Sequence, residues 1–165
     1  MSGDDLLSAG DLTARLAHSR AALTAAIEGM DEEAFRRRTA SGDWNAAEVL
    51  AHLLAHERRF LELAQRALAE ERPAVQSRGE GQQLEEAKAA QRMPVPQIVH
   101  GLLAQRRDTL RVLERLGAAE LERPLQHSRL GEISPRWLFR RLAEHETEHA
   151  QQITSMRKAL AGTAT

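Results

Sequence analysis

The sequence predicts an all-α protein, a four-helix bundle with a long connection between its second and third helices. Ala, Leu, Glu, Arg and Gln dominate, β-branched residues are sparse and tyrosine is absent, a usage that favours helices over strands. Four long segments carry helix signals, and long helices with mixed short and long connections are typical of bundles. The 165 residues are expected to form a single domain spanning 1–165.

The first helix is expected from about residue 8 to Met30, and the sequence does not mark either end sharply. Its apolar stripe is formed by Leu12, Leu16, Leu23 and Ile27. The second helix begins sharply, because Asn45 can cap it and Glu48, three residues on, can complete a capping box. We expect this helix to end before Pro73.

The long connection is expected over residues 74–93, which are polar, with a short helix over 83–92. The third helix follows Pro94 and Pro96 and is expected to end at Gly117.

A structured loop is expected over residues 117–133, ahead of the last helix. Ser134 can cap that helix, with Pro135 at its first helical position, and the helix is expected to run to about Leu160. Charge-rich residues 106–115, RRDTLRVLER, are interpreted as a solvated helix face without a functional role.

Charge and composition argue against several function classes. The 23 Lys+Arg balance 24 Asp+Glu, so we expect no nucleic-acid partner. Cysteine is absent, so any thiol must come from a substrate or cofactor. Asp4 and Asp5 stand where a signal peptide carries basic residues, and no apolar run approaches the ~20 residues of a membrane span. We therefore expect a cytoplasmic protein without a membrane partner.

Residues 145–149, HETEH, match the H-E-x-x-H pattern of zinc peptidases, in which two histidines share a metal and the glutamate accepts a proton. Peptidases of this type take a third ligand, His or Glu, further downstream. No His, Asp or Glu follows His149, and the composition does not favour a sheet edge that would hold a peptide. The sequence therefore argues against a protease.

His145 and His149 are nevertheless expected to face the core, because they fall within the apolar stripe of the last helix. That stripe contains Leu138, Leu142, Ile153, Met156 and Leu160. Two buried histidines with separate hydrogen bonds are the simpler interpretation. A shared metal satisfies both rings at once, so we favour metal binding.

A third ligand must come from upstream, where the second helix offers His52 and His56. On a helical wheel His56 lies at the edge of the apolar face, and His52 is rotated about 40° further toward the polar side. Periodicity alone therefore prefers His56. His18, His100 and His127 are isolated and are expected at the surface or in packing roles, although His127 can line the mouth of a pocket.

Two segments carry a family resemblance, DWNAAEVLAHLLAHE at residues 43–57 and ELERPLQHSRLGEISPRWLFRRLAEHETEHAQQI at 120–153. In these motifs and their spacing the chain resembles the DinB-like superfamily of four-helix-bundle metalloproteins. The resemblance implies a divalent metal, often nickel or zinc, held by His52, His145 and His149 with one open position. It prefers His52 to His56, which we keep as the reserve ligand.

The resemblance also implies a function, since members of known activity include thiol-S-transferases and maleylpyruvate isomerases that use a low-molecular-weight thiol. We therefore expect a transferase or isomerase acting on a small-molecule electrophile. A thiol cofactor suits a chain without cysteine, because a metal can deprotonate it. Arg136, Arg140 and Arg141 are candidates to receive a substrate carboxylate.

Two alternatives stay open. A metal-dependent hydrolase would use Glu146 as its catalytic general base; this residue lies about 60° off the apolar stripe, and a solvated helix glutamate is the other interpretation. Glu57 is a similar candidate. The second alternative is a non-enzymatic, stress-associated metal-binding bundle, with a homodimer as its expected assembly.

Overall fold

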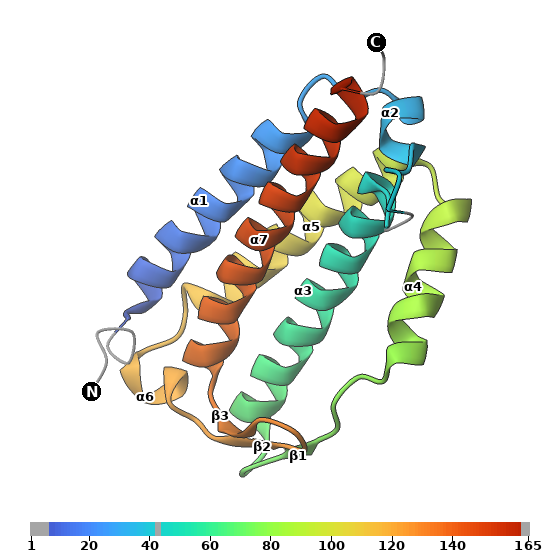
Figure 1. Cartoon of the computed structure of the whole chain (residues 1–165). Coiled ribbons are helices and arrows are strands. Elements are labelled where there is room, and N and C mark those ends of the chain that lie inside the picture. Colours follow the sequence, from blue (N-terminus) through green and yellow to red (C-terminus); the bar gives the residue numbers. More distant parts are fainter. Residues whose placement is uncertain (1–6, 42–43, 163–165) are drawn as a thin grey trace.

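A computed structural model describes residues 7–41 and 44–162 of the chain, and four long helices form its bundle (Figure 1). These helices are α1 (Ala9–Ile27), α3 (Ala46–Ala69), α5 (Val95–Leu113) and α7 (Pro135–Gly162). The pairs α1 with α7, α3 with α5 and α3 with α7 are in direct contact. The predicted four-helix bundle is confirmed. Asp4, Asp5 and Asp43, which the sequence arguments used, lie outside the described residues.

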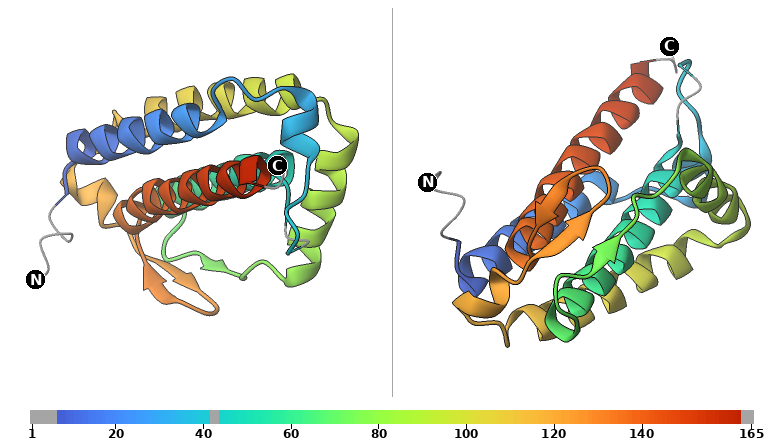
Figure 2. Two further views of the ribbon diagram at one scale, coloured as in Figure 1. Left: turned by 45° about the horizontal axis from the view of Figure 1, so that its top comes forward. Right: turned by 90° about the horizontal axis from the view of Figure 1, so that it is seen from below.

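The long connection between α3 and α5 is also confirmed, and it contains β1 (Ala74–Val75) and α4 (Glu80–Arg92). The helix expected over 83–92 therefore begins three residues earlier than predicted. α4 packs against α3, and Figure 2 shows it beside the four long helices. A further short helix, α2 (Glu32–Arg36), joins α1 to α3 and was not predicted.

The loop before α7 contains α6 (Ala118–Leu121), β2 (Leu125–His127) and β3 (Gly131–Ile133). β2 pairs in parallel with β1 and antiparallel with β3, so a three-stranded sheet joins the end of α3 to the start of α7 (Figure 1). Gly131 has a φ of +76°, a conformation that glycine adopts without strain. The sheet was not predicted, because strands of two or three residues are too short to show an alternating pattern.

Side-chain caps determine where the long helices begin. The Glu48 amide donates to Asn45 Oδ1 at 3.0 Å, and the Asn45 amide donates to Glu48 Oε2 at 2.9 Å, so the predicted capping box is present. Ser8 and Asp11 form a second box at α1. The Trp137 amide donates to Ser134 Oγ at 3.3 Å, as expected for a cap of α7. These contacts fix the start of the helices that carry the histidines.

The buried apolar residues form two clusters at opposite ends of the bundle. One includes Leu23, Leu50, Ile98 and Ile153, and the other Leu12, Leu63, Leu113, Leu138 and Phe139. Between these clusters each long helix contributes a buried polar side chain: Ser19 on α1, Glu57 on α3, Arg106 on α5 and Glu146 on α7. The bundle therefore has a polar layer at its middle. Among the described helices none is long and apolar enough to cross a membrane.

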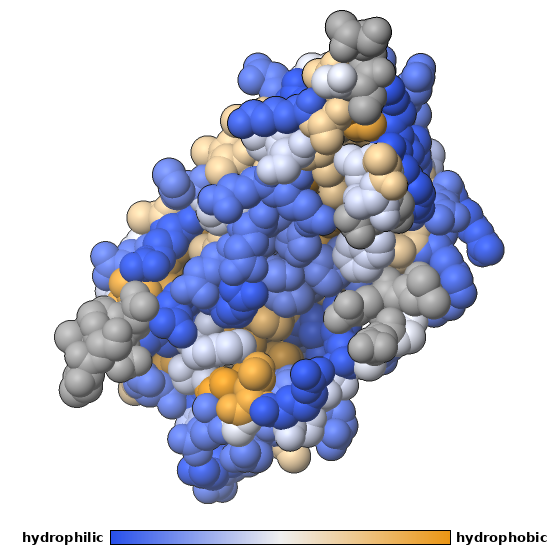
Figure 3. All heavy atoms as spheres, in the orientation of Figure 1, coloured by the Kyte–Doolittle hydropathy of each residue, from blue (hydrophilic) through white to orange (hydrophobic). Residues whose placement is uncertain are grey.

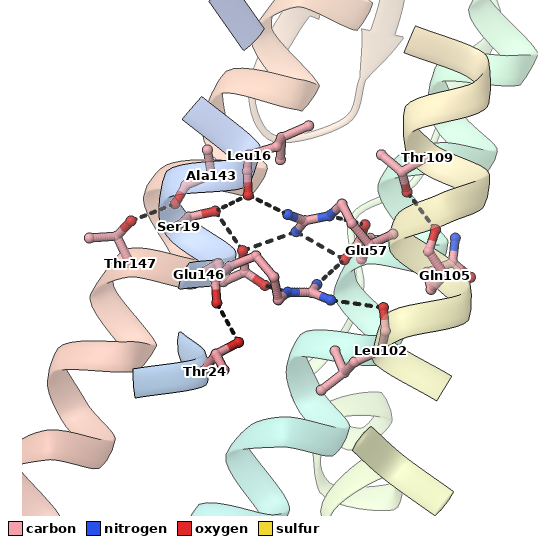
Figure 4. A network of polar contacts seen from close by, with 12 residues as sticks. Leu16, Ser19, Thr24, Glu57, Leu102, Gln105, Thr109, Ala143, Glu146 and Thr147 are labelled. Atoms are coloured by element: carbon pink, nitrogen blue, oxygen red, sulfur yellow. Dashed lines mark hydrogen bonds and ion pairs between the residues drawn. The ribbon is translucent and has the colours of Figure 1, made fainter. Parts of the chain in front are cut away.

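Inside that layer two arginines bridge two buried glutamates (Figure 4). Arg106 Nε donates to Glu57 Oε1 at 2.7 Å and Nη2 donates to Glu146 Oε2 at 3.0 Å. Arg20 Nε donates to Glu146 Oε1 at 2.7 Å, and its Nη2 donates to Glu57 Oε2 at 3.0 Å. Ser19 Oγ donates to Glu146 at 2.5 Å. The network therefore joins all four long helices.

Arg106 corrects the interpretation of residues 106–115 as a wholly solvated face, because only 6% of this residue is exposed. Burial alone would lower the pKa of Arg106, but the hydrogen bonds and negative charges of Glu57 and Glu146 raise it above its ordinary value. The sequence did not reveal this inward arginine, since its two partners lie on other helices.

Candidate metal centre

Three histidines from two helices converge at the middle of the bundle. His52 lies on α3, and His145 and His149 lie one turn apart on α7. The Nε2 atom of His145 is 3.3 Å from that of His52 and 3.1 Å from that of His149. Two ligand nitrogens of a tetrahedral zinc site lie about 3.3 Å apart, given bonds of about 2.0–2.1 Å. These three residues can therefore hold a metal ion.

Two rings of the triad, His52 and His145, are suited to a cation because their surroundings keep them neutral. Burial, followed by the nearby His149 and Arg78, lowers the pKa of His52 to about 4. Burial, followed by His149, His52 and Arg141, lowers the pKa of His145 to about 3. Both rings are therefore unprotonated near neutral pH, and the neutral imidazole is the form that binds a metal.

The second ring nitrogens of His149 and His52 show what can orient these two rings, whereas that of His145 is buried without a hydrogen-bond partner. His149 Nδ1 lies 2.6 Å from Gln152 Oε1, so the amide oxygen accepts the Nδ1 proton and leaves Nε2 free to bind a metal. His52 Nδ1 and Glu86 Oε2 are buried without hydrogen-bond partners and lie 3.7 Å apart. Glu86, which α4 supplies, is therefore placed to orient His52.

Replacing Gln152 by leucine is expected to weaken metal binding about 10–100-fold, because His149 loses the acceptor that fixes its proton at Nδ1. Titration against a chromophoric zinc chelator measures the affinity. Gln151→Leu is the matched control, since Gln151 is exposed on the same helix turn. Equal weakening by both substitutions would contradict the orienting role of Gln152.

His56, the reserve ligand, lies outside the group of three. Its ring stacks on His145, with centroids 4.0 Å apart, and lies tilted against Phe60 at a centroid distance of 4.1 Å. Burial, with the neighbouring His145 and His52, lowers the pKa of His56 to about 2. The structure thus brings together the three histidines that the family resemblance implies. The helical wheel misplaced His52 because an idealised straight helix carries an angular error similar to the 40° at issue.

The interpretation of Glu146 as a solvated glutamate is wrong, because 1% of the residue is exposed and both its oxygens contact arginines or Ser19. Glu57 is equally buried in the same network. The wheel gave only the angle of Glu146, whereas its burial depends on arginines from α1 and α5. Its role as a general base stays a prediction.

Of the three candidate arginines only Arg141 lies beside the triad. It lines a pocket of about 410 Å³ together with His56 and His127, a position that the sequence had left open for His127 beside a surface or packing role. Arg136 is buried and pairs with Glu122 at 2.5 Å and with the Leu7 carbonyl. Arg140 lies 3.8 Å from Glu144 on the same helix.

Sequence reasoning missed Arg59 and Arg78, which also line the pocket, and Glu86 and Gln152 beside the triad. Gln152 follows His149 by three residues, a spacing that places both on one helix face and could have identified it. Arg78 and Glu86 lie in or near the long connection, where no periodicity indicated their direction.

Comparison with known proteins places the chain among bundles of this type. The family model of the DinB superfamily matches residues 15–153. YfiT from Bacillus subtilis, described as a probable metal-dependent hydrolase with an unusual four-helix bundle topology, superposes with a TM-score of 0.80 at 18% identity, covering 93% of this chain and 87% of that one. TT2238, a four-helix bundle protein, gives 0.62 at 18% identity, covering 87% and 95%. No curated protein matches.

Proposed function

This chain belongs to the DinB superfamily, and from that premise we propose that it is a divalent-metal-dependent enzyme that uses a low-molecular-weight thiol in a transfer or isomerisation reaction. The observation that carries this proposal is the convergence of His52, His145 and His149 beside a pocket. Three neutral ligands leave coordination positions open, as catalytic rather than closed structural sites do.

Each residue of the site has a distinct task in this reaction. The three histidines would hold the metal through Nε2, and Gln152 keeps the His149 proton on Nδ1. A bound zinc or nickel ion would supply Lewis acidity that lowers the pKa of a thiol at an open position. In a transfer reaction the sulfur would bond to an electrophilic carbon of the substrate while the bond from that carbon to its leaving group breaks; the leaving group would depart with the electron pair, and the thiol proton would go to solvent. In an isomerisation the sulfur would add to a carbon–carbon double bond, the neighbouring carbon would take up a proton, and both would be lost again after rotation about the resulting single bond.

A thiol is favoured as nucleophile because the described carboxylates around the triad are all in ion pairs. Glu57 and Glu146 pair with Arg20 and Arg106. Hydrolysis needs a carboxylate that accepts a proton from water, whereas a thiol is acidic enough to ionise with metal assistance alone.

Glu86 and Glu148 are also engaged, because each pairs with an arginine that lines the pocket. Glu86 pairs with Arg78, and Glu148 pairs with Arg141 at 2.8 Å. The hydrogen bond and the charge of Arg141 lower the pKa of Glu148, which makes this carboxylate a weaker base. This arrangement supports activation of the nucleophile by the metal rather than by a protein carboxylate.

A metal-dependent hydrolase is the second candidate, favoured by the fold shared with YfiT. In that reaction Glu146 would accept a proton from water, and it would have to leave Arg106 and Arg20 to do so. A non-enzymatic metal-binding bundle is the third class.

To test the proposal, the zinc- or nickel-loaded protein is mixed with chlorodinitrobenzene and one thiol from a panel that includes glutathione, mycothiol and bacillithiol, and the rate of thioether formation is measured. We expect turnover above the uncatalysed rate with at least one thiol, none without thiol, and about a hundredfold loss on His149→Ala. Absence of any thiol-dependent turnover would overturn the proposed reaction.

Nitrophenyl acetate, supplied without thiol, tests the second candidate in the same samples. Hydrolysis that disappears on Glu146→Gln but survives Glu57→Gln would favour the hydrolase. These two substitutions are matched, because both carboxylates sit in one buried network. A protein that holds metal but turns over neither class of substrate would favour the non-enzymatic alternative.

A further inference from the structure

The histidine triad lies at one end of two facing rows of side chains. On α7 the row continues from the triad toward the start of the helix, and on α3 it continues toward the end, in both cases every fourth residue. The members are Trp137, Arg141, His145 and His149 on α7 and His52, His56 and Phe60 on α3. Residues four apart share a helix face, so both rows are continuous.

Ring contacts connect the two rows from the triad outward. The His56 ring lies 4.0 Å from the His145 ring and 4.1 Å from the Phe60 ring, and Phe60 lies 6.1 Å from Trp137, measured between centroids. Of these rings, those of His56, Phe60 and Trp137 line the 410 Å³ pocket. The His56 ring therefore separates the pocket from His145, a candidate metal ligand.

The remaining walls of this pocket are strongly basic. Arg59 comes from α3, Arg78 from the connection between β1 and α4, Arg129 from the turn between β2 and β3, and Arg141 from α7. No Asp or Glu is among the described residues that line it. Figure 3 shows this face hollowed in its lower half, where hydrophobic surface borders hydrophilic surface. The chain as a whole has a net charge of −1, so the basic pocket is a local concentration of charge.

Several of these arginines are available to an incoming anion. Arg59 pairs at 2.9 Å with Glu62 and Arg141 at 2.8 Å with Glu148, and both glutamate side chains are 58% exposed. Surface ion pairs of this kind contribute about 0–1 kcal/mol, so a ligand can replace the glutamate.

Two further arginines have unused donors. Arg78 Nη1 is buried without a hydrogen-bond partner, although Arg78 pairs with Glu86 through Nη2. Arg129 has no ion-pair partner within residues 7–41 and 44–162. Burial and the charge of Arg59 lower the pKa of Arg78, and burial followed by Arg59 and Arg129 lowers the pKa of His127. The pocket thus carries a positive potential that no described carboxylate inside it cancels.

We propose that this pocket binds a small organic anion, a carboxylate or phosphate ester with an apolar or aromatic body, as the substrate or cofactor of the triad. Guanidinium groups match carboxylate and phosphate oxygens in pairs, and the Phe60 and Trp137 rings contact the apolar body. Arg141 lies one helical turn, roughly 6 Å along the axis, from His145. The anionic group is therefore held about one turn away from the reacting end of the molecule.

This inference rests on the proposed function only where it calls the triad the reacting centre. Binding of an anion in the pocket does not depend on that function and is tested separately. The chain has two tryptophans, and Trp137 lines the pocket whereas Trp44 lies beside His52. Their indole N–H signals in a ¹⁵N correlation spectrum report on the pocket and on a reference position. The full chain, with and without zinc, is titrated with phenylsuccinate, phenyl phosphate and the neutral phenylacetamide.

We expect at least one anion to move the Trp137 signal more than the Trp44 signal, and phenylacetamide to require at least about tenfold more ligand. Arg78→Gln and Arg141→Gln are each expected to weaken anion binding about tenfold, with the free Trp44 signal unchanged as evidence of folding. Arg107→Gln is the matched control, because Arg107 is exposed on α5. The stronger of the two anions identifies the group as carboxylate or phosphate.

Equal binding of phenylacetamide, no response to either anion, or the same weakening by Arg107→Gln would overturn the inference. Arginine-dependent anion binding in a protein that retains no zinc would keep the anion pocket and reject the metal-dependent function. Zinc binding without any anion response would reject the pocket and leave that function standing.

Discussion

Replacing Arg106 by methionine is expected to lower the free energy of unfolding by about 3–5 kcal/mol, because it leaves two buried carboxylates with one guanidinium between them. Glu57 and Glu146 are each 1% exposed, so water cannot replace the lost donors. Arg106 also donates to the Leu16 carbonyl at 2.6 Å, and that acceptor loses this donor and keeps the hydroxyl of Ser19 at 3.1 Å. Urea denaturation followed by circular dichroism measures the change.

Arg107→Met is the matched control for this substitution, since Arg107 is the next residue on α5 and is exposed. Its effect is expected to stay within about 0.5 kcal/mol. A combined variant with Arg20→Met, Arg106→Met, Glu57→Leu and Glu146→Leu removes the whole network and is expected to recover much of the lost stability, because apolar residues need no partner. A loss below about 1 kcal/mol in the single variant would show that water or rearrangement satisfies the carboxylates.

The second large expected effect is the loss of bound metal when a histidine of the triad is replaced. Protein purified without a histidine tag or chelator is expected to hold about one equivalent of divalent metal, with complete loss on His52→Ala or His149→Ala and retention on His56→Ala. Two remaining imidazoles hold a metal far more weakly than three, whereas His56 contributes only ring stacking to His145. Elemental analysis after dialysis gives the stoichiometry.

His100→Ala is the control for this series, since His100 is an exposed histidine on α5. Circular dichroism of each variant shows whether the helices persist. Loss of metal with His56→Ala but not with His52→Ala would mean that the helical wheel had chosen the ligand correctly. Metal-free samples throughout, including after incubation with zinc or nickel, would leave the non-enzymatic bundle as the better account.

Much of the fold could be predicted because its signals are local. Asn45 with Glu48, and Ser134 with Pro135, marked two helix starts within a few residues of sequence. The spacing of His145 and His149 likewise placed both rings on one face of one helix. Such features need no knowledge of what packs against them.

The parts that could not be predicted depend on neighbouring elements. Whether His52 or His56 joins the triad depends on how α3 is rotated against α7, a tertiary property within the error of a wheel. Arg106 resembles its solvated neighbours in sequence and differs only because carboxylates from α3 and α7 face it. The basic pocket needs the connection before α4 and the turn before β3, neither of which has helical periodicity.

The polar layer between the two apolar clusters determines how the four long helices are aligned along their axes. Leucines can exchange partners with other leucines, so apolar packing alone distinguishes weakly between alignments one turn apart, about 5.4 Å. If α5 moved along its axis by one turn, the Arg106 guanidinium would lie among leucines, and Glu57 and Glu146 would lose the hydrogen bonds that Arg106 donates. Because those glutamates directly follow His56 and His145 in sequence, the same alignment holds His52 opposite His145. The buried ion pairs of Glu57 and Glu146 therefore fix the positions of the triad histidines along the helix axes, although they make no contact with the triad.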